Sequence, residues 1–338
     1  MNIEKESDLF MSEERFIQMD LFGENDRCIS KFIKSPLNYT GNKYDLLSQI
    51  YPKLPKDFNT FVDCFGGGFD VGANIDCNKV VYNDIVTKVK RLLEYIYSHD
   101  YNTIVSQIES IINKFNLSDT YHNGYTQYGV EGNLGLSRYN KEPYTKLRDY
   151  YNSFKDDCEE KDLLFFVLIM FSFSNQIRFN QNGLFNMPVG KADFNEKVRE
   201  NLKNFSNTLH NKDITFLNDS YDKIPYEQFD KPFFYCDPPY LISTAPYNEE
   251  NGESGWNESS EIKLLNWLSD LNSKGYKFAL SNVIEHKGRT NTILKEWIEK
   301  NNFKVYYLNK DYRAANYQIK DRDAITKEIL VVNYIIDR

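Results

Sequence analysis

NTFVDCFGGGFDVG, residues 59–72, decides the fold of this chain, because a short β-rich run stops there at three consecutive glycines. Asp63 lies near the end of the run, and the glycines are Gly66, Gly67 and Gly68. Glycine adopts positive φ without a steric penalty and lets a ligand come close to the backbone. The stretch therefore predicts either a ligand-binding strand end or simply a tight turn.

A second strand end indicates the kind of ligand. The run NKVVYND, residues 78–84, ends in Asp84, sixteen residues after Gly68. In α/β sheets a carboxylate at this place accepts hydrogen bonds from ribose hydroxyls. The arrangement favours a nucleoside ligand. The glycine spacing is not GxGxxG, which disfavours a nicotinamide cofactor, and the segment GNK lacks the GxxxxGK[ST] pattern of a phosphate-binding loop.

The order of the other patterns predicts an α/β sheet split by a mostly helical insertion. Helical patterns lie beside these two runs, as NKYDLLSQIY and IVTKVKRLLEYIYSH, and dominate the chain from about 100 to 210, apart from a loop at 121–140. Strand-like runs then resume as DITFLN, KPFFYC, GYKFALSN, FKVYYLN and KEILVVNY. We expect four parts: a flexible acidic extension (1–34), the cofactor half of a catalytic domain (35–95), a recognition insertion (96–210) and the second catalytic half (211–338).

The composition is typical of a globular cytosolic protein. Of the 338 residues, 41% are hydrophobic and 15% aromatic, which is enough for a sizeable core. No apolar run approaches the roughly 20 residues that cross a bilayer, and the acidic start MNIEKESDLF does not resemble a signal peptide. The five cysteines form neither a CxxC pair nor a disulfide framework, so we expect reduced thiols, no membrane span and no metal.

The acidic excess is concentrated in two segments. The net charge is −8, of which residues 1–34 carry −3 and residues 249–261 carry −5. The rest of the chain is balanced, which leaves room for a local basic face toward a polyanion.

The stretch KPFFYCDPPYL, residues 231–241, ends a β-rich run with an acid, two prolines and an aromatic ring. The prolines, Pro238 and Pro239, fix extended backbone and donate no hydrogen bond. The Asp237 carboxylate and the Pro238 carbonyl become two rigid acceptors beside the flat ring of Tyr240. Such a pair matches an exocyclic amino group, as in adenine, cytosine or glutamine. Accepting both amino hydrogens frees the nitrogen lone pair to attack a methyl sulfonium; the alternative is a proline-bent strand end without catalytic function.

Ordered motifs in this chain resemble the Dam-type (D12 class, alpha group) DNA adenine-N6 methyltransferases. They are LNYTGNKYDLL, FVDCFGGG, VVYND, RFNQNGLFNMPVGK (178–191) and YCDPPY. The resemblance covers roughly residues 35–338 and implies a Rossmann-like S-adenosylmethionine-dependent methyltransferase sheet, with a helical target-recognition insertion that carries a β-hairpin. It implies methyl transfer from S-adenosyl-L-methionine to N6 of an adenine flipped out of double-stranded DNA, as in DNA modification of the restriction-modification kind.

The resemblance also implies roles for single residues. The catalytic set is Asp237, Pro238, Pro239 and Tyr240. The cofactor-binding set is Tyr39, Lys43, Asp63, Phe65, Gly66, Gly67, Gly68, Asp84 and Asp237. The DNA-binding set is Phe173, Gln176, Arg178, Asn180, Asn186, Pro188 and Lys191. Arg178 is implied to read a guanine, which a guanidinium does by two parallel hydrogen bonds, whereas the ring of Phe173 suits either a wedge into the duplex or core packing.

Other implied positions are less specific. Ser281 and Asn282, in SNVIEH, match a strand end near the catalytic face. The acidic loop at 241–257, with Tyr247 and Trp256, matches a segment beside the flipped base, or it is simply a solvated loop. Three residues, Asn38, Gln176 and Ala192, depart from the types associated with reading GATC, so that recognition sequence is not predicted.

Three competing functions remain open. The same fold can methylate the exocyclic N4 of cytosine, although serine commonly replaces the first acid there, and Asp237 therefore favours adenine. A glutamine methyltransferase is expected to carry asparagine at this position and no DNA hairpin. A catalytically idle DNA-binding relative is the third alternative, against which the intact DPPY tetrapeptide and glycine turn count.

The extension contains a possible docking peptide. Its residues Gln18, Met19, Asp20, Leu21 and Phe22 resemble the peptide by which bacterial proteins bind the replication sliding clamp. Leu21 and Phe22 would fill an apolar pocket of the clamp. The alternative is a hydrophobic patch that packs the extension on its own domain.

Overall fold

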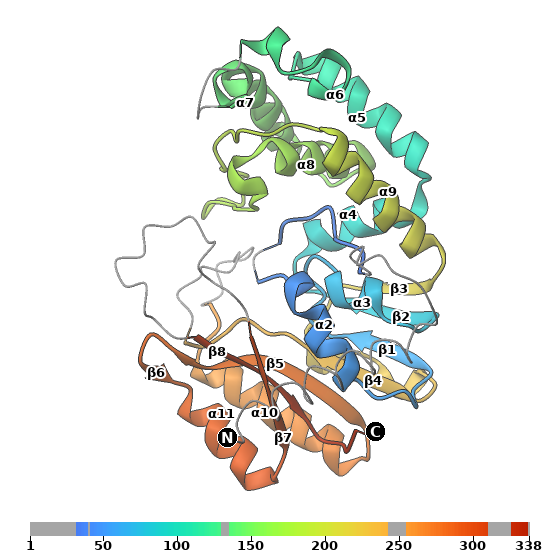
Figure 1. The fold of residues 1–338 in the computed structure, drawn as a ribbon, viewed down its shortest axis with the longest axis vertical. Coiled ribbons are helices and arrows are strands. Elements are labelled where there is room, and N and C mark those ends of the chain that lie inside the picture. The colour runs from blue at the N-terminus through green and yellow to red at the C-terminus, as the bar shows by residue number, and fades with distance from the viewer. Residues whose placement is uncertain (1–31, 40, 130–134, 243–254, 310–325, 337–338) are drawn as a thin grey trace, which may run out of the picture. The chain divides into compact units, whose positions relative to one another are not determined.

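The computed structural model describes residues 32–39, 41–129, 135–242, 255–309 and 326–336. Residues Ile33–Arg338 form one compact unit, and the fold below is that of this unit. The predicted α/β class is confirmed, because a central, mostly parallel sheet lies among helices (Figure 1).

The strands follow the β-rich runs of the sequence. They are β1 (Thr60–Asp63), β2 (Lys79–Asn83), β3 (Asp213–Leu217), β4 (Pro232–Cys236), β5 (Lys277–His286), β6 (Arg289–Thr290), β7 (Lys304–Leu308) and β8 (Thr326–Val332). All seven predicted runs lie on strands. The structure adds the two-residue strand β6, which pairs with the end of β5 as a short hairpin.

The sheet has the order β3-β2-β1-β4-β5-β8-β7. Strands β3, β2, β1, β4 and β5 are parallel, whereas β8 runs antiparallel to both of its neighbours. From β1 the chain builds outward to β2 and β3 and then returns to place β4 on the other side of β1. In open α/β sheets ligands bind at such a switch point, outside the carboxyl ends of the strands. The ends of β1 and β4 are therefore where a site is expected.

The helices are α2 (Leu47–Ile50), α3 (Asp70–Asn74), α4 (Thr87–Ser98), α5 (Tyr101–Phe115), α6 (Thr120–Asn123), α7 (Ser137–Ser153), α8 (Glu159–Phe171), α9 (Glu196–His210), α10 (Glu258–Ser273) and α11 (Thr292–Asn301). The predicted helix at NKYDLLSQIY is only partly α-helical, since 3₁₀ turns flank α2. Helix α7 begins within the segment predicted as a loop at 121–140.

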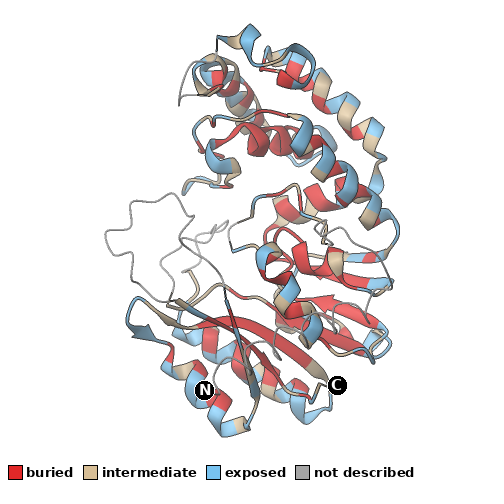
Figure 2. Cartoon of the chain, viewed as in Figure 1, coloured by how far each residue is buried: buried red, intermediate tan, exposed pale blue. Residues whose placement is uncertain are grey.

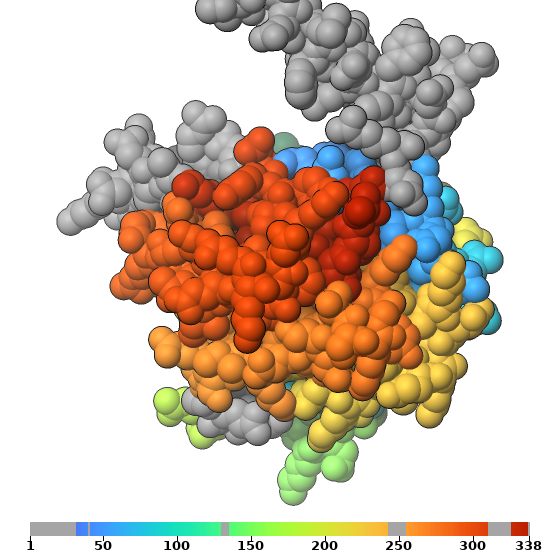
Figure 3. Space-filling view, turned by 90° about the horizontal axis from the view of Figure 1, so that it is seen from below, coloured from blue at the N-terminus to red at the C-terminus, as the bar shows by residue number. Residues whose placement is uncertain are grey.

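Two layers of helices cover the sheet. On one face the apolar sides of α10 and α11 pack on β-strand residues such as Val62, Phe234 and Phe278. Figure 3 shows this side of the unit, where the orange and red C-terminal part of the chain forms most of the surface. On the other face Tyr82 contacts Phe69 at the start of α3, at 5.0 Å between ring centroids. Both faces of the parallel strands are thus buried, as their near-continuous apolar sequence requires.

The insertion between β2 and β3 has its own buried centre. Ten consecutive residues of α8, 162–171, are buried, and the helix appears red along its length in Figure 2. Its apolar residues lie all around the helix, which is typical of a helix that other helices enclose. Helices α4, α5 and α7 pack around α8.

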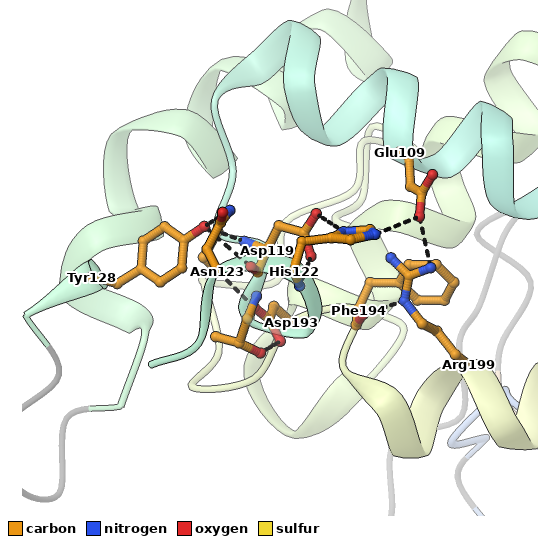
Figure 4. Close-up of polar contacts among 10 residues, drawn as sticks. Glu109, Asp119, His122, Asn123, Tyr128, Asp193, Phe194 and Arg199 are labelled. Carbon is orange, nitrogen blue, oxygen red and sulfur yellow. Dashed lines mark hydrogen bonds and ion pairs between the residues drawn. The ribbon is translucent and has the colours of Figure 1, made fainter. Parts of the chain in front are cut away.

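A polar cluster fastens α6 to the neighbouring helices (Figure 4). The buried Asp193 accepts hydrogen bonds from the Thr120 N–H at 2.8 Å and from the Thr120 hydroxyl at 2.7 Å. Arg199 of α9 donates to the Glu109 carboxylate of α5 at 2.7 Å. These contacts join α6 to the segment before α9, and α9 to α5, across long sequence separations, so the insertion is held by polar bonds as well as by its apolar centre.

Candidate active site

In the turn after β1, the positions of Gly66 and Gly67 require glycine. A Cβ on Gly66 would lie 2.3 Å from the ring of Tyr82, and Gly67 has a φ of +46°. The Gly66 N–H donates to the Asn83 carbonyl at 2.8 Å, and the Tyr82 hydroxyl donates to the Gly67 carbonyl at 3.0 Å. These bonds fasten the turn to β2. The backbone of the three glycines lines a cavity.

Asp84 lies directly after β2 and holds this turn from the other side. Its Oδ2 accepts from the Gly67 N–H at 2.8 Å and its Oδ1 from the Val86 N–H at 2.8 Å. These two bonds fix the orientation of the Asp84 carboxylate at the edge of a cavity. The next residue, Ile85, is 64% exposed and lines the same cavity.

The cavity has a volume of about 400 Å³, which is within the range of small-molecule sites. The predicted cofactor residues that line it are Tyr39, Lys43, Asp63, Phe65, Gly66, Gly67, Gly68, Asp84 and Asp237, which is the complete predicted set. The sequence did not indicate further lining residues, namely Ile85, Asp219, Ser220, Tyr221, Ser260 and Lys263. An apolar residue directly after an acidic strand end is the sequence signal that could have been used for Ile85.

Asp237 follows β4 and connects the cavity to the DPPY segment. The Lys43 ammonium donates to Asp237 Oδ2 at 2.6 Å and lies 3.7 Å from Glu328 Oε1. The Tyr240 hydroxyl lies 3.1 Å from Asp237 Oδ1 and 2.9 Å from Glu328 Oε1, so it bridges the two carboxylates. Lys43 also lies over the ring of Tyr240, 5.1 Å from its centroid. The acid and the aromatic ring of the tetrapeptide are thus held in place from β8 and from the segment before α2.

Burial changes the acidity of the carboxyl groups in this site. Desolvation raises the pKa of Asp237 above its usual value, and the Lys43 ammonium opposes that rise. Asp63, at the end of β1, is only 2% exposed. Desolvation raises its pKa well above the usual value, and the nearby charge of Asp237 adds to that rise. The Lys43 ammonium thus favours the ionised form of Asp237, whereas burial favours the protonated form of Asp63.

Ser281 and Asn282 lie behind the site and are fully buried. The Ser281 and Tyr235 hydroxyls are 2.7 Å apart, between β5 and β4. The Asn282 amide donates to Glu261 of α10 at 3.1 Å. Both residues support the strand ends from within the sheet rather than line the cavity.

The segment at 172–190 turns back on itself as the sequence predicts. It pairs only through two isolated bridges, Ser172 with Val189 and Phe179 with Phe185, so it is a hairpin without regular strands. The exposed Arg178 donates to the Asn186 side chain at 2.8 Å and to the Asn186 carbonyl at 3.0 Å across this hairpin. Its guanidinium is therefore oriented before any ligand is bound.

The other predicted DNA-binding residues lie along the same segment. Asn180 closes the hairpin turn, because its Oδ1 accepts from the backbone N–H groups of Asn182 and Leu184. Phe173 is 40% exposed, so the alternative of core packing is wrong for this ring. Gln176 is half-buried, and Pro188 and Lys191 are exposed. The Asn38 side chain donates to the Ser174 carbonyl at 2.8 Å, which connects the first motif to the insertion.

A comparison with protein families agrees with the motifs and the cavity. Residues 39–315 match the model of the D12 class N6 adenine-specific DNA methyltransferases. The chain belongs to this family. The family match extends from Tyr39 across the glycine turn, the insertion and the DPPY segment, and ends before Glu328 on β8.

The D12 relatives include modification methylases. The chain is 39% identical over 308 residues to the modification methylase StsI of Streptococcus sanguinis and 38% identical over 309 residues to the type II methyltransferase M.FokI of Planomicrobium okeanokoites. Both matches cover 90% of this chain but only 43% of the relative, so the chain spans less than half the length of either. It is also 24% identical over 212 residues to the DNA adenine methylase of Escherichia coli K12, covering 63% of this chain and 66% of that protein.

Several predictions on the D12 chain are not tested by these findings. The peptide from Gln18 to Phe22 and the loop residue Tyr247 lie outside the described residues. Trp256 is described and lines the cavity, so this end of the acidic loop is not simply solvated. Within the described ranges no cluster of three metal-ligating side chains occurs, and no helix there is both long and apolar enough to cross a membrane.

Proposed function

We propose that this chain transfers the methyl group of S-adenosyl-L-methionine to the exocyclic N6 of an adenine flipped out of double-stranded DNA. The observation that carries the proposal is the connection of two features by Asp237. This carboxylate lines the cavity beside the glycine turn and is also the first residue of the DPPY acceptor pair. The D12 family match supports adenine as the base.

The cavity fits S-adenosyl-L-methionine, whose sulfonium supplies the methyl group. Asp84 would accept from the ribose hydroxyls, and Ile85 offers an exposed apolar surface for a planar base. The amino acid part would lie along the backbone of the glycine turn, which lines the cavity, while the ring of Tyr82 fills the space that a Cβ of Gly66 would need. Tyr39 would close the site on the side of the first motif, because its ring lies within 3.0 Å of where a Cβ of Gly67 would be.

Asp237 and the Pro238 carbonyl activate the acceptor amine. Each would accept one N6 hydrogen, so that the amine nitrogen becomes more tetrahedral and its lone pair can attack the methyl carbon as the carbon–sulfur bond breaks and S-adenosylhomocysteine leaves. The methylated nitrogen would then lose its positive charge by giving one hydrogen, as a proton, to the Asp237 carboxylate that accepts it. Lys43 lowers the pKa of the buried Asp237 and so favours its ionised form, in which the carboxylate is the stronger acceptor. Tyr240, whose hydroxyl is held by two carboxylates, presents its ring at a fixed angle for stacking of the flipped base.

The insertion is proposed to recognise the DNA. Arg178 is oriented to donate to O6 and N7 of a guanine, and the exposed Lys191 is placed for a phosphate. Phe173 protrudes from a turn whose next two residues, Ser174 and Asn175, have positive φ, so the ring is presented on a stiff support. Residues 35–95 and 211–338 would then form the catalytic domain, and residues 96–210 would form the recognition insertion.

An acceptor panel tests this function. The purified chain is incubated with tritiated S-adenosyl-L-methionine and, separately, with double-stranded DNA, RNA and protein. Label is expected only in DNA. Label in glutamine-containing protein would support a glutamine methyltransferase instead, and cofactor binding without label in any acceptor would support an idle relative.

The names of the modification methylases StsI and M.FokI favour a partner nuclease for this chain, which sequencing of its genomic neighbourhood would test.

A further inference from the structure

Glu261 is a fully buried acid, which is unusual because burial takes the carboxylate out of water. It lies in the first turn of α10 and has no exposed surface. Its Oε2 accepts from the indole N–H of Trp256 at 2.7 Å, and its Oε1 accepts from the side-chain amides of Asn282 at 3.1 Å and Asn291 at 2.9 Å. Burial raises the pKa of Glu261, whereas these three donors lower it. All three contacts require it to accept hydrogen bonds and none requires it to donate.

The cost of this arrangement suggests a purpose beyond packing. Removing a charged group from water is unfavourable unless hydrogen bonds replace the lost solvation, and an apolar side chain would fill the same space without that cost. The three donors come from different elements: Trp256 precedes α10, Asn282 lies on β5, and Asn291 caps α11. Glu261 therefore fixes the segment before α10 relative to the sheet.

Trp256 is the donor that reaches the active site. It lines the cofactor cavity, and its ring contacts Phe65 edge-on, with centroids 6.0 Å apart and ring planes at 81°. Phe65 belongs to the glycine turn after β1 and packs in turn on Tyr221, at 5.3 Å between centroids. An indole has a single N–H, so its bond to Glu261 is the polar contact that sets how the ring stands against Phe65.

From these contacts we propose that Glu261 is a positioning residue for the cofactor, because it holds Trp256 as one wall of the cavity. This inference rests on the proposed function. It predicts that Glu261 acts on cofactor affinity through the indole, without touching the cofactor itself.

The conservative variant Glu261→Gln breaks one of the three contacts selectively. The oxygens of Asn282 and Asn291 already accept from the backbone N–H groups of Val283 at 2.7 Å and Leu294 at 3.0 Å, which fixes both amides with their NH₂ groups toward Glu261. A glutamine oxygen satisfies these two donors, but its NH₂ group then faces the Trp256 N–H. The indole loses its acceptor while the links to β5 and α11 remain.

The experiment is a double-mutant cycle that is read by calorimetry with S-adenosylhomocysteine. Glu261→Gln is expected to weaken binding about tenfold, the size expected for a buried donor left without an acceptor. In the Trp256→Phe background no indole N–H is present at position 256, so the same substitution is expected to have little further effect. Trp297→Phe is the matched control, because it also removes an indole bond to α10, to Ser269 at 2.8 Å, away from the cavity.

Tryptophan emission gives a second readout that does not depend on activity. Addition of S-adenosylhomocysteine is expected to change the emission of the wild type and of Trp297→Phe, but not of Trp256→Phe. Equal cofactor affinity of wild type and Glu261→Gln, or an equal loss in both backgrounds of the cycle, would overturn the inference and leave the proposed function intact. Absence of any binding by the folded wild type would overturn both.

Discussion

Asp237 combines two demands that oppose each other at the level of a single residue. In the proposed reaction it accepts a hydrogen bond from the acceptor amine, which the ionised carboxylate does best, whereas burial favours the protonated form. The Lys43 ammonium, 2.6 Å away, opposes the effect of burial, although the pKa of Asp237 stays above its usual value. The resemblance implied that both residues lie at the cofactor, but their direct bond was not predicted, because 194 positions separate them in the sequence.

This pairing predicts a pH dependence. Activity that requires ionised Asp237 falls as pH falls through its pKa, so the acid limb of kcat/KM should lie above the usual aspartate value of about 3.9. Lys43→Met removes the group that lowers this pKa, so the limb should move to higher pH. The profile is measured at saturating S-adenosyl-L-methionine, with melting temperatures to exclude unfolding. A limb that stays in place, or that moves to lower pH, contradicts the account of Lys43.

Asp237 and Asp84 should fail in different ways when they are removed. Asp237→Ala is expected to lower kcat by about a hundredfold or more, as for loss of a group that acts on the reacting centre, with cofactor affinity little changed. Asp84→Ala is expected to weaken S-adenosyl-L-methionine by about tenfold to a hundredfold, since it removes a charged acceptor. Calorimetry and single-turnover rates separate the two effects, and the reverse pattern would invalidate both assignments.

At the level of elements, the order of strands in the sequence was enough to predict which strand-end acids lie together. The carboxyl ends of β1, β2 and β4 meet at one edge, so Asp63, Asp84 and Asp237 could be expected in one site from their strand-end positions alone. The burial of Glu261 and Glu328 near this site could not be predicted. The sequence around each acid is typical of a solvated helix surface or a strand end, and only tertiary packing places the acid in the interior.

The hairpin of the insertion predicts a division of roles between its basic residues. Arg178→Ala should cost about 1–3 kcal/mol and relax one position of the recognition sequence, whereas Lys191→Ala should weaken all sequences alike. Asn186→Ala tests the orientation of the guanidinium, because it removes the acceptor of the 2.8 Å bond while keeping the charge. It should relax the same position as Arg178→Ala, but less.

The measurement is a methylation profile on randomised duplexes for the three variants and the wild type. A profile of Arg178→Ala with unchanged base preference would exclude guanine reading by this residue. Loss of preference at one position in Lys191→Ala, with no general weakening, would contradict its assignment to a phosphate.

At the scale of the whole molecule, the helical insertion interrupts the sheet between β2 and β3 without disturbing the register of either strand. The alternation of patterns sufficed to predict this arrangement, because the inserted helices enclose their own apolar helix, α8. The sequence could not predict how the insertion meets the catalytic part. That contact includes the bond from the Asn38 side chain to the Ser174 carbonyl and the ion pair of Arg91 with Asp162 at 2.7 Å, neither of which has a signature in composition or spacing.

Methylation of adenine N6 in DNA through Asp237 is tested most directly by mass spectrometry of nucleosides. Duplex DNA is incubated with the purified chain and S-adenosyl-L-methionine carrying a deuterated methyl group. We expect deuterated N6-methyladenine with the wild type, and at least about a hundredfold less with Asp237→Ala. Deuterated N4-methylcytosine, or N6-methyladenine formed equally well by Asp237→Ala, would contradict it.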